Sequence, residues 1–190
     1  MRKGQLWVVG AALAGVTLVS VPAEASVKVI GSGFGRQCYE YARAGHASDS
    51  GVETCNKALE ERTLAPEDRA ATFVNRGILH MYAKQLQLAL ESYESAIRLN
   101  PSLAEAYVNK GVALVNLGRD TEAVAAASQA LELKPERPEI AYYTRGVAYE
   151  LLGNMRAAYS DYRQAVALKP GWQEPLTQLQ RFSVVPKARG

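Results

Sequence analysis

Glycine and proline recur through most of the chain at an almost constant interval. Three glycines are separated by 34 and then 35 residues, and three prolines show the same two intervals: Gly77, Gly111 and Gly146, and Pro101, Pro135 and Pro170. A fixed period of this length indicates stacked structural units that each contact only their neighbours. The one extra residue falls in the connection 136–138, where an insertion disturbs the fold least.

The spacing of residues inside each unit predicts two helices. In the first unit Phe73, Gly77 and His80 are spaced i, i+4, i+7, which places them on one face of a helix. The same spacing then recurs at Ala89, Tyr93 and Ala96. Each proline ends the second helix of its unit, because proline cannot continue the hydrogen-bond ladder. The expected fold class is therefore all-α.

These residues resemble the signature of the tetratricopeptide repeat (TPR) family, which runs aromatic, Gly, large residue, Ala, aromatic, Ala, Pro. The first unit supplies Phe73, Gly77, His80, Ala89, Tyr93, Ala96 and Pro101. The second supplies Tyr107, Gly111, Leu114, Ala123, Ala127, Ala130 and Pro135, and the third supplies Tyr142, Gly146, Tyr149, Ala158, Tyr162, Ala165 and Pro170. Ala127 departs from the aromatic pattern. The resemblance covers about residues 68–171 and implies a TPR helical-repeat solenoid.

The remaining segments complete the expected organisation. Its parts are a signal peptide (1–25), a flexible lead-in (26–35), a degenerate disulfide-linked helix pair (36–64), three TPR repeats within 65–171 (about 70–103, 104–138 and 139–172), a capping helix (173–182) and a tail (183–190). A capping helix covers the apolar face that the last repeat of a solenoid would otherwise expose.

The first 25 residues have the three parts of a secretory signal peptide in the usual order. Arg2 and Lys3 are followed by the uncharged apolar run 6–21 and by a small-x-small motif that ends at Ala25. We expect cleavage after Ala25, and an uncleaved anchor is the alternative. The predicted location of the mature chain is therefore periplasmic or secreted, and the two are not distinguished.

An exported chain meets oxidising conditions, so its two cysteines are expected to form a disulfide. Cys38 and Cys55 fall on the first and second helices of the degenerate pair, where they would face each other across the hairpin. Two buried free thiols are the alternative.

In TPR proteins the first helix of each repeat usually lines a concave groove, and here these helices carry a second stripe beside the core stripe. The stripe consists of Val74, Asn75, Ile78, Val108, Asn109, Val112, Tyr143, Thr144 and Val147. The resemblance implies a groove that binds an extended peptide or a partner helix. Packing against neighbouring helices alone is the other interpretation of these residues.

Asn75 and Asn109 occupy equivalent places, with Thr144 in the third repeat. In TPR proteins such an Asn ladder can hold a peptide backbone, because an amide both donates and accepts hydrogen bonds. The subgroup that clamps peptide carboxylates has basic residues where this chain has Val74, Val108 and Tyr143. A C-terminal acidic peptide is therefore not the favoured ligand.

The charged residues do not indicate a nucleic-acid partner. The chain has 22 basic and 19 acidic residues, with no dense basic face. Arg76, Lys110 and Arg145 recur before each glycine. They would either contact an acidic strip on a partner or pair with acids on the second helices, with Glu94 expected for Arg76 and Asp161 for Arg145.

The sequence offers almost nothing for catalysis. No Ser/His/Asp or Cys/His arrangement emerges, and a disulfide would consume both thiols. His80 occupies a core position of the first repeat and His46 lies in a turn; a zinc site formed by both histidines and both cysteines would match no known finger spacing. We therefore expect no enzyme activity, no cofactor and no metal site.

The function expected from the sequence is a protein–protein interaction module or adaptor for a protein or peptide partner. Nucleic-acid binding and membrane insertion after signal cleavage are not expected. The alternative is a self-assembling structural scaffold subunit of an envelope complex, in which the same stripes would close a homo-oligomer.

Overall fold

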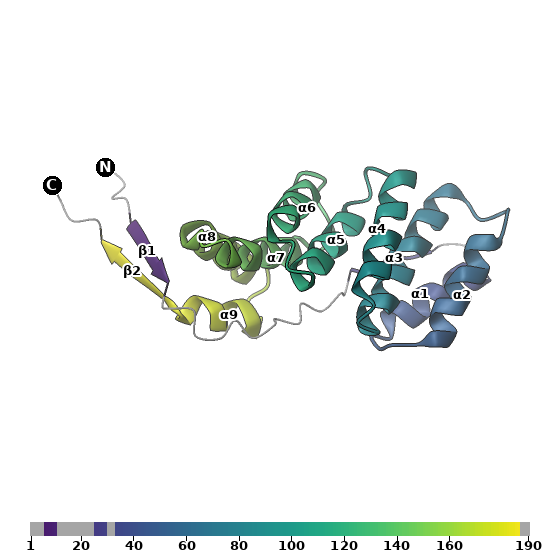
Figure 1. Cartoon of the computed structure of the whole chain (residues 1–190), viewed down its shortest axis with the longest axis horizontal. Helices are drawn as coiled ribbons and strands as arrows, with labels where there is room; N and C mark the ends of the chain where they lie inside the picture. The colour runs from purple at the N-terminus through teal and green to yellow at the C-terminus, as the bar shows by residue number, and fades with distance from the viewer. Residues whose placement is uncertain (1–5, 11–24, 30–32, 187–190) are drawn as a thin grey trace.

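The computed structural model describes residues 6–10, 25–29 and 33–186. Within these ranges the helices follow one another as a row of antiparallel pairs (Figure 1). The three expected repeats are α3 (Pro66–Tyr82) with α4 (Leu86–Leu99), α5 (Ala104–Asn116) with α6 (Asp120–Glu132), and α7 (Pro138–Leu151) with α8 (Met155–Leu168). The all-α helical-repeat prediction is confirmed. No helix among the described residues is both long and apolar enough to cross a membrane.

The glycine of each first helix lies where the second helix approaches most closely. A methyl group built on Gly77 would come within 2.4 Å of the Tyr93 ring, and one on Gly146 within 2.8 Å of the Tyr162 ring. Both rings are fully buried. In the second repeat Ala127 replaces the ring, and a methyl group on Gly111 would find no atom closer than 3.5 Å. The first and third hairpins are therefore more tightly filled at this point than the second.

The degenerate pair is formed by α1 (Phe34–Arg43) and α2 (Asp49–Glu60), which pack against α3. Cys38 on α1 and Cys55 on α2 are both fully buried, and their Sγ atoms lie at bonding distance, 2.07 Å apart. Their placement on opposite helices of the hairpin agrees with the expectation from the sequence.

At the other end, α9 (Gln173–Gln180) covers the third repeat. Trp172, just before α9, is buried against Tyr143, with 4.9 Å between the ring centroids. Glu150 is also buried; it accepts a hydrogen bond from the Tyr162 hydroxyl (2.8 Å) and pairs with Arg181 (3.0 Å). The cap is therefore held by aromatic packing and by one buried carboxylate.

The expected tail (183–190) is corrected over residues 183–186, and residues 187–190 lie outside the described residues. Strand β2 (Phe182–Pro186) pairs antiparallel with β1 (Leu6–Gly10), with Leu6 opposite Pro186 (Figure 1). Two segments from opposite ends of a chain leave no local periodicity by which their pairing could be recognised. Since β1 lies within the predicted signal peptide, the strand pair belongs to the chain before cleavage.

The second helices of the last two repeats begin differently. Helix α6 begins at Asp120, after Arg119, and no side chain caps it. Asn154 caps α8, because its side chain accepts a hydrogen bond from the Ala157 amide. A Gly in the left-handed region precedes each of these N-cap positions, at residues 118 and 153, and ends the turn that follows the first helix.

Candidate peptide-binding groove

Residues 25–29 lie across the first helices of the repeats, and we call them the N-terminal strap. The Val27 amide donates to Asn75 Oδ1 (3.0 Å), and Asn75 Nδ2 donates to the Val27 carbonyl (2.8 Å). Asn109 Nδ2 donates to the Ala25 carbonyl at 3.1 Å. The two amides on α3 and α5 therefore hold the backbone of an irregular segment without contacting its side chains.

The strap is buried at both ends and more exposed between them. Ala25 (5% exposed) and Val29 (2%) are buried, Ser26 and Val27 are half-buried, and Lys28 is exposed. Ala25 packs in the same apolar cluster as Val108 and Val112, and Val27 packs against the cluster of the first repeat. The expected flexible lead-in (26–35) is therefore corrected over residues 26–29, which lie against the repeats, and over 34–35, which belong to α1; residues 30–32 lie outside the described residues.

All nine residues predicted for the groove are buried: Val74, Asn75, Ile78, Val108, Asn109, Val112, Tyr143, Thr144 and Val147. Those of the first two repeats include the two amides that hold the strap. Tyr143 instead packs between Tyr162 and Trp172. Its contacts are therefore those of a residue that packs against neighbouring helices, which was the other interpretation of this stripe. Burial raises the pKa of the Tyr143 hydroxyl above its ordinary value of 10, which keeps it neutral.

The ladder is only partly used by the strap. Asn75 pairs with both the amide and the carbonyl of one residue, but Asn109 Oδ1 and Thr144 Oγ1 have no hydrogen-bond partner among the described residues. Asn109 is 1% exposed and Thr144 is fully buried. A buried polar atom without a partner carries a desolvation cost. The groove therefore holds unused hydrogen-bonding capacity toward the third repeat.

Space remains beside the strap. A hollow of about 490 Å³ is bounded by Ser26, by the end of α1 and by Tyr82 and Arg137. A much smaller one of about 30 Å³ lies between Ala25–Ser26 and the Glu105–Val108 turn of α5. Both hollows are lined in part by Ser26 and Arg137, so the strap leaves open space where it passes these residues.

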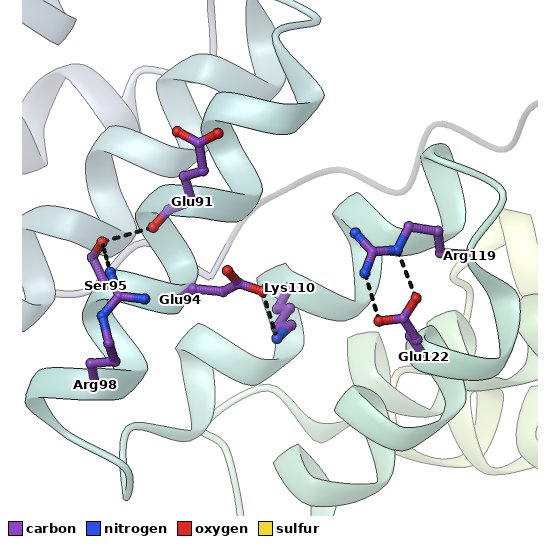
Figure 2. A network of polar contacts seen from close by, with 7 residues as sticks. All are labelled: Glu91, Glu94, Ser95, Arg98, Lys110, Arg119 and Glu122. Atoms are coloured by element: carbon purple, nitrogen blue, oxygen red, sulfur yellow. Dashed lines mark hydrogen bonds and ion pairs between the residues drawn. The ribbon is translucent and has the colours of Figure 1, made fainter.

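The basic residues before the three glycines make contacts within the solenoid. Figure 2 shows Lys110 on α5 paired with Glu94 on α4, at 3.0 Å. Arg145 makes a two-point pair with Asp161 (2.7 and 3.0 Å), as expected. The expected Glu94–Arg76 pair is wrong, because Glu94 lies with Lys110.

Arg76 contacts neutral groups instead. It donates to Ser92 Oγ and Asn56 Oδ1 and lies over the Phe73 ring. Burial lowers the pKa of its guanidinium. Each of the three basic residues thus reaches the second helix of the preceding helix pair, at Asn56, Glu94 or Ser128. Lys110 and Arg145 thus pair with acids on second helices, as one of the two interpretations expected, and all three basic residues also join neighbouring helix pairs.

Models of the tetratricopeptide repeat match residues 74–138 and 140–171. These ranges contain α4–α8 and most of α3, which the structure arranges as stacked hairpins. The chain belongs to the tetratricopeptide repeat family.

Similar proteins include multidomain proteins that share only the TPR region. Serine/threonine-protein phosphatase 5 from Rattus norvegicus is 33% identical over 129 residues, which is 68% of this chain and 25% of that protein. The chain spans about a quarter of this relative. The match is confined to the TPR region, so it gives no support for phosphatase activity here.

Solved structures agree on the fold. The Arabidopsis OM64 TPR domain is 26% identical, with a TM-score of 0.59 over 62% of this chain and 96% of that domain. The second TPR domain of human RPAP3, solved in complex with the HSP70 peptide SGPTIEEVD, is 25% identical, with a TM-score of 0.57 over 61% of this chain and 96% of that domain.

The strap is the part of the TPR groove that sequence reasoning missed. Its signal is the alternation Ala25, Ser26, Val27, Lys28, Val29, a two-residue period that indicates an extended segment with one buried face. The predicted signal-peptide boundary after Ala25 hid this pattern, because it divides the five residues between two expected segments.

Neither histidine lies in the groove. His46 is exposed, with Nδ1 3.3 Å from the Ala44 carbonyl. His80 is 8% exposed, and its Nδ1 lies 2.7 Å from Gln85 Oε1, as a core residue of the first repeat. Burial lowers the pKa of His80 below 6.5, and the contact with Gln85 opposes that shift.

This burial predicts a specific pH dependence of stability. The unfolded chain takes up a proton on His80 near pH 6.5, whereas the folded chain does so only at lower pH. The contribution of His80 to the free energy of unfolding should therefore be constant above pH 6.5 and decrease as the pH falls below that value. Urea titrations of the unaltered chain between pH 7.5 and 5 should show this decline, and His80→Gln should flatten it. His46→Gln is the matched control and should leave the decline in place. An equal decline in all three chains would assign it to other groups.

Proposed function

We propose that this TPR protein is a non-enzymatic adaptor that binds an extended segment of a partner protein in the groove lined by Asn75 and Asn109. The observation that carries the proposal is the two-point contact between Asn75 and the Val27 backbone. An amide that donates to a carbonyl and accepts from the same residue's N–H recognises any extended main chain. The groove's chemistry thus suits a peptide in extended form better than a partner helix, whose backbone groups are already paired.

The ligand should differ from the acidic peptide that the RPAP3 domain binds. Val74, Val108 and Tyr143 are apolar or aromatic and buried, so they offer no cation for a peptide carboxylate. Affinity should come instead from backbone hydrogen bonds and from small apolar side chains that fill the spaces between the rungs. The peptide SGPTIEEVD is accordingly expected not to bind this chain.

The proposed compartment is the exported one, periplasmic or extracellular. The basic start, the apolar run 6–21 and the small-x-small motif support it. The buried Cys38–Cys55 contact in the end pair supports it as well, because disulfides persist where thiols are not kept reduced.

Capture of partners from the exported fraction tests the binding site. The immobilised chain should retain a partner that an Asn75→Ala, Asn109→Ala double variant loses, because that variant lacks both backbone contacts. Asn116→Ala is the matched control: it also removes one amide of α5 that donates to a carbonyl, that of Val112 (2.8 Å), but it makes no contact with the strap. All variants would first be compared for helicity.

Equal capture by the double variant and the unaltered chain would exclude the ladder as the binding site. Tyr143→Ala is unsuitable for this test, since Tyr143 packs between two other aromatic rings and its truncation would destabilise the third repeat. The mass of the purified chain as a function of concentration checks the alternative, a self-assembling scaffold subunit. A partner captured only as further copies of this chain would favour that alternative.

A further inference from the structure

The strap occupies the hydrogen-bonding groups that a partner would need. Both polar atoms of the Asn75 side chain are engaged by Val27, and Asn109 Nδ2 is engaged by Ala25. A second backbone cannot pair with Asn75 while Val27 remains there. A partner backbone and the strap therefore cannot bind to Asn75 at the same time.

Apolar contacts anchor the strap at its C-terminal end. Val29 is 2% exposed, and its Cγ1 lies 3.1 Å from where a methyl group on Gly35 would be, in the first turn of α1. Only residues 30–33 separate Val29 from α1. A ligand attached through so short a connection has a local concentration on the order of millimolar. The strap therefore competes strongly even if its five residues bind weakly as a separate peptide.

We propose that residues 25–29 are a built-in competitor for the groove, and that the partner is an extended segment with small or β-branched side chains at alternate positions which displaces them. Cleavage after Ala25 would remove the contact with Asn109 but leave residues 26–29, whose Val27 makes both contacts with Asn75. This inference rests on the proposed function, because it takes the same groove as the binding site.

The strap supplies the template for the partner: Ala25 packs with Val108 and Val112 and Val27 packs against the cluster of the first repeat, whereas Lys28 between Val27 and Val29 is exposed. Asn109 Oδ1, on the side chain that holds Ala25, has no hydrogen-bond partner among the described residues, so another segment can gain a contact that the strap does not make.

Competition has a measurable consequence. The apparent affinity for a partner equals the intrinsic affinity multiplied by the fraction of molecules whose groove is open. Releasing the strap should therefore raise affinity without any change in the groove itself. Val27→Pro removes the N–H that donates a hydrogen bond to Asn75 Oδ1. Val29→Asp places a charge at a buried apolar position. The two together form the released-strap variant.

The test uses a labelled synthetic peptide with the sequence of residues 25–29, blocked at both ends. A strap that closes about 90% or more of the grooves lowers the apparent affinity of the unaltered full chain at least about tenfold. The peptide should therefore bind the released-strap variant at least about tenfold more tightly than the unaltered chain. Lys28→Asp is the matched control: it introduces the same carboxylate one residue away on the exposed side and should bind the peptide as weakly as the unaltered chain. Adding Asn75→Ala to the released-strap variant should abolish binding.

Amide hydrogen exchange gives a second readout that needs no added peptide. The Val27 amide of the unaltered chain should exchange slowly, and Asn75→Ala should accelerate its exchange while α5 and α6 remain protected. Rapid exchange of Val27 in the unaltered chain would overturn the inference.

Equal peptide binding by the unaltered and released-strap chains would also overturn it, as would failure of both to bind. The capture experiment separates these failures from a failure of the proposed function. A partner lost on Asn75→Ala, Asn109→Ala but unaffected by strap release would leave the groove as the binding site and remove only the competitor.

Discussion

Gly77→Ala should destabilise the protein by about 2 kcal/mol, whereas Gly111→Ala should stabilise it by up to about 1 kcal/mol. A methyl group at residue 77 would lie 2.4 Å from the Tyr93 ring, which is fully buried, so the ring or the helix must shift. At residue 111 the nearest atom is 3.5 Å away, because the second repeat has Ala127 where the ring would be. Only the second substitution therefore gains the helix propensity of alanine without a clash.

Urea unfolding followed by circular dichroism measures both changes under the same conditions. Gly146→Ala provides an internal check, since its methyl group would meet the Tyr162 ring at 2.8 Å and should be destabilising like Gly77→Ala. Similar effects of alanine at residues 77 and 111 would contradict the explanation, because the presence of the ring is what distinguishes the two sites.

Removal of the Cys38–Cys55 link should cost about 3 kcal/mol, since it releases a loop closed between residues 17 apart. The loss should fall on α1 and α2. Among the described helices, α3 is the main neighbour of this pair, and an end unit of a solenoid depends on its own hairpin more than an internal unit does.

Three samples make the measurement: the oxidised chain, the same chain with reductant, and Cys38→Ala, Cys55→Ala. Hydrogen exchange should locate the loss in residues 34–60 while α5–α8 stay protected. The double variant should be insensitive to reductant. Intact mass with and without thiol alkylation reports the linkage directly, and two alkylated thiols in the unreduced chain would contradict it.

Local chemistry made much of this fold predictable. Each hairpin is specified by residues within 34 positions of one another, so the in-phase glycines and prolines were enough to locate the three repeats. The cysteine pair was predictable for the same reason, because both members lie in one hairpin. The partner of Arg145 was also found, whereas Glu94 was assigned to Arg76 although it lies with Lys110. Sequence spacing alone does not tell whether a long side chain turns toward its own hairpin or the preceding one.

Contacts between distant segments were not predictable. Val27 meets Asn75 across 48 positions, and β1 meets β2 from opposite ends of the chain. The strap and the two strands lie outside the repeated units, so the period that located the helices carries no information about which residues these segments contact. The ladder residues could be listed from the sequence as a set, but the set alone does not reveal that part of the chain already lies on Asn75 and Asn109.

The direction in which the strap crosses the repeats has a practical consequence for how the protein is handled. The chain runs from Asn109 on α5 toward Asn75 on α3, so any sequence fused directly in front of residue 26 starts over the second repeat. An N-terminal affinity tag would therefore be held beside the rungs at which capture is to be measured and could obstruct them. A tag placed after residue 190 follows β2, which lies at the α9 end of the row of helices in Figure 1, and is the appropriate choice for immobilisation.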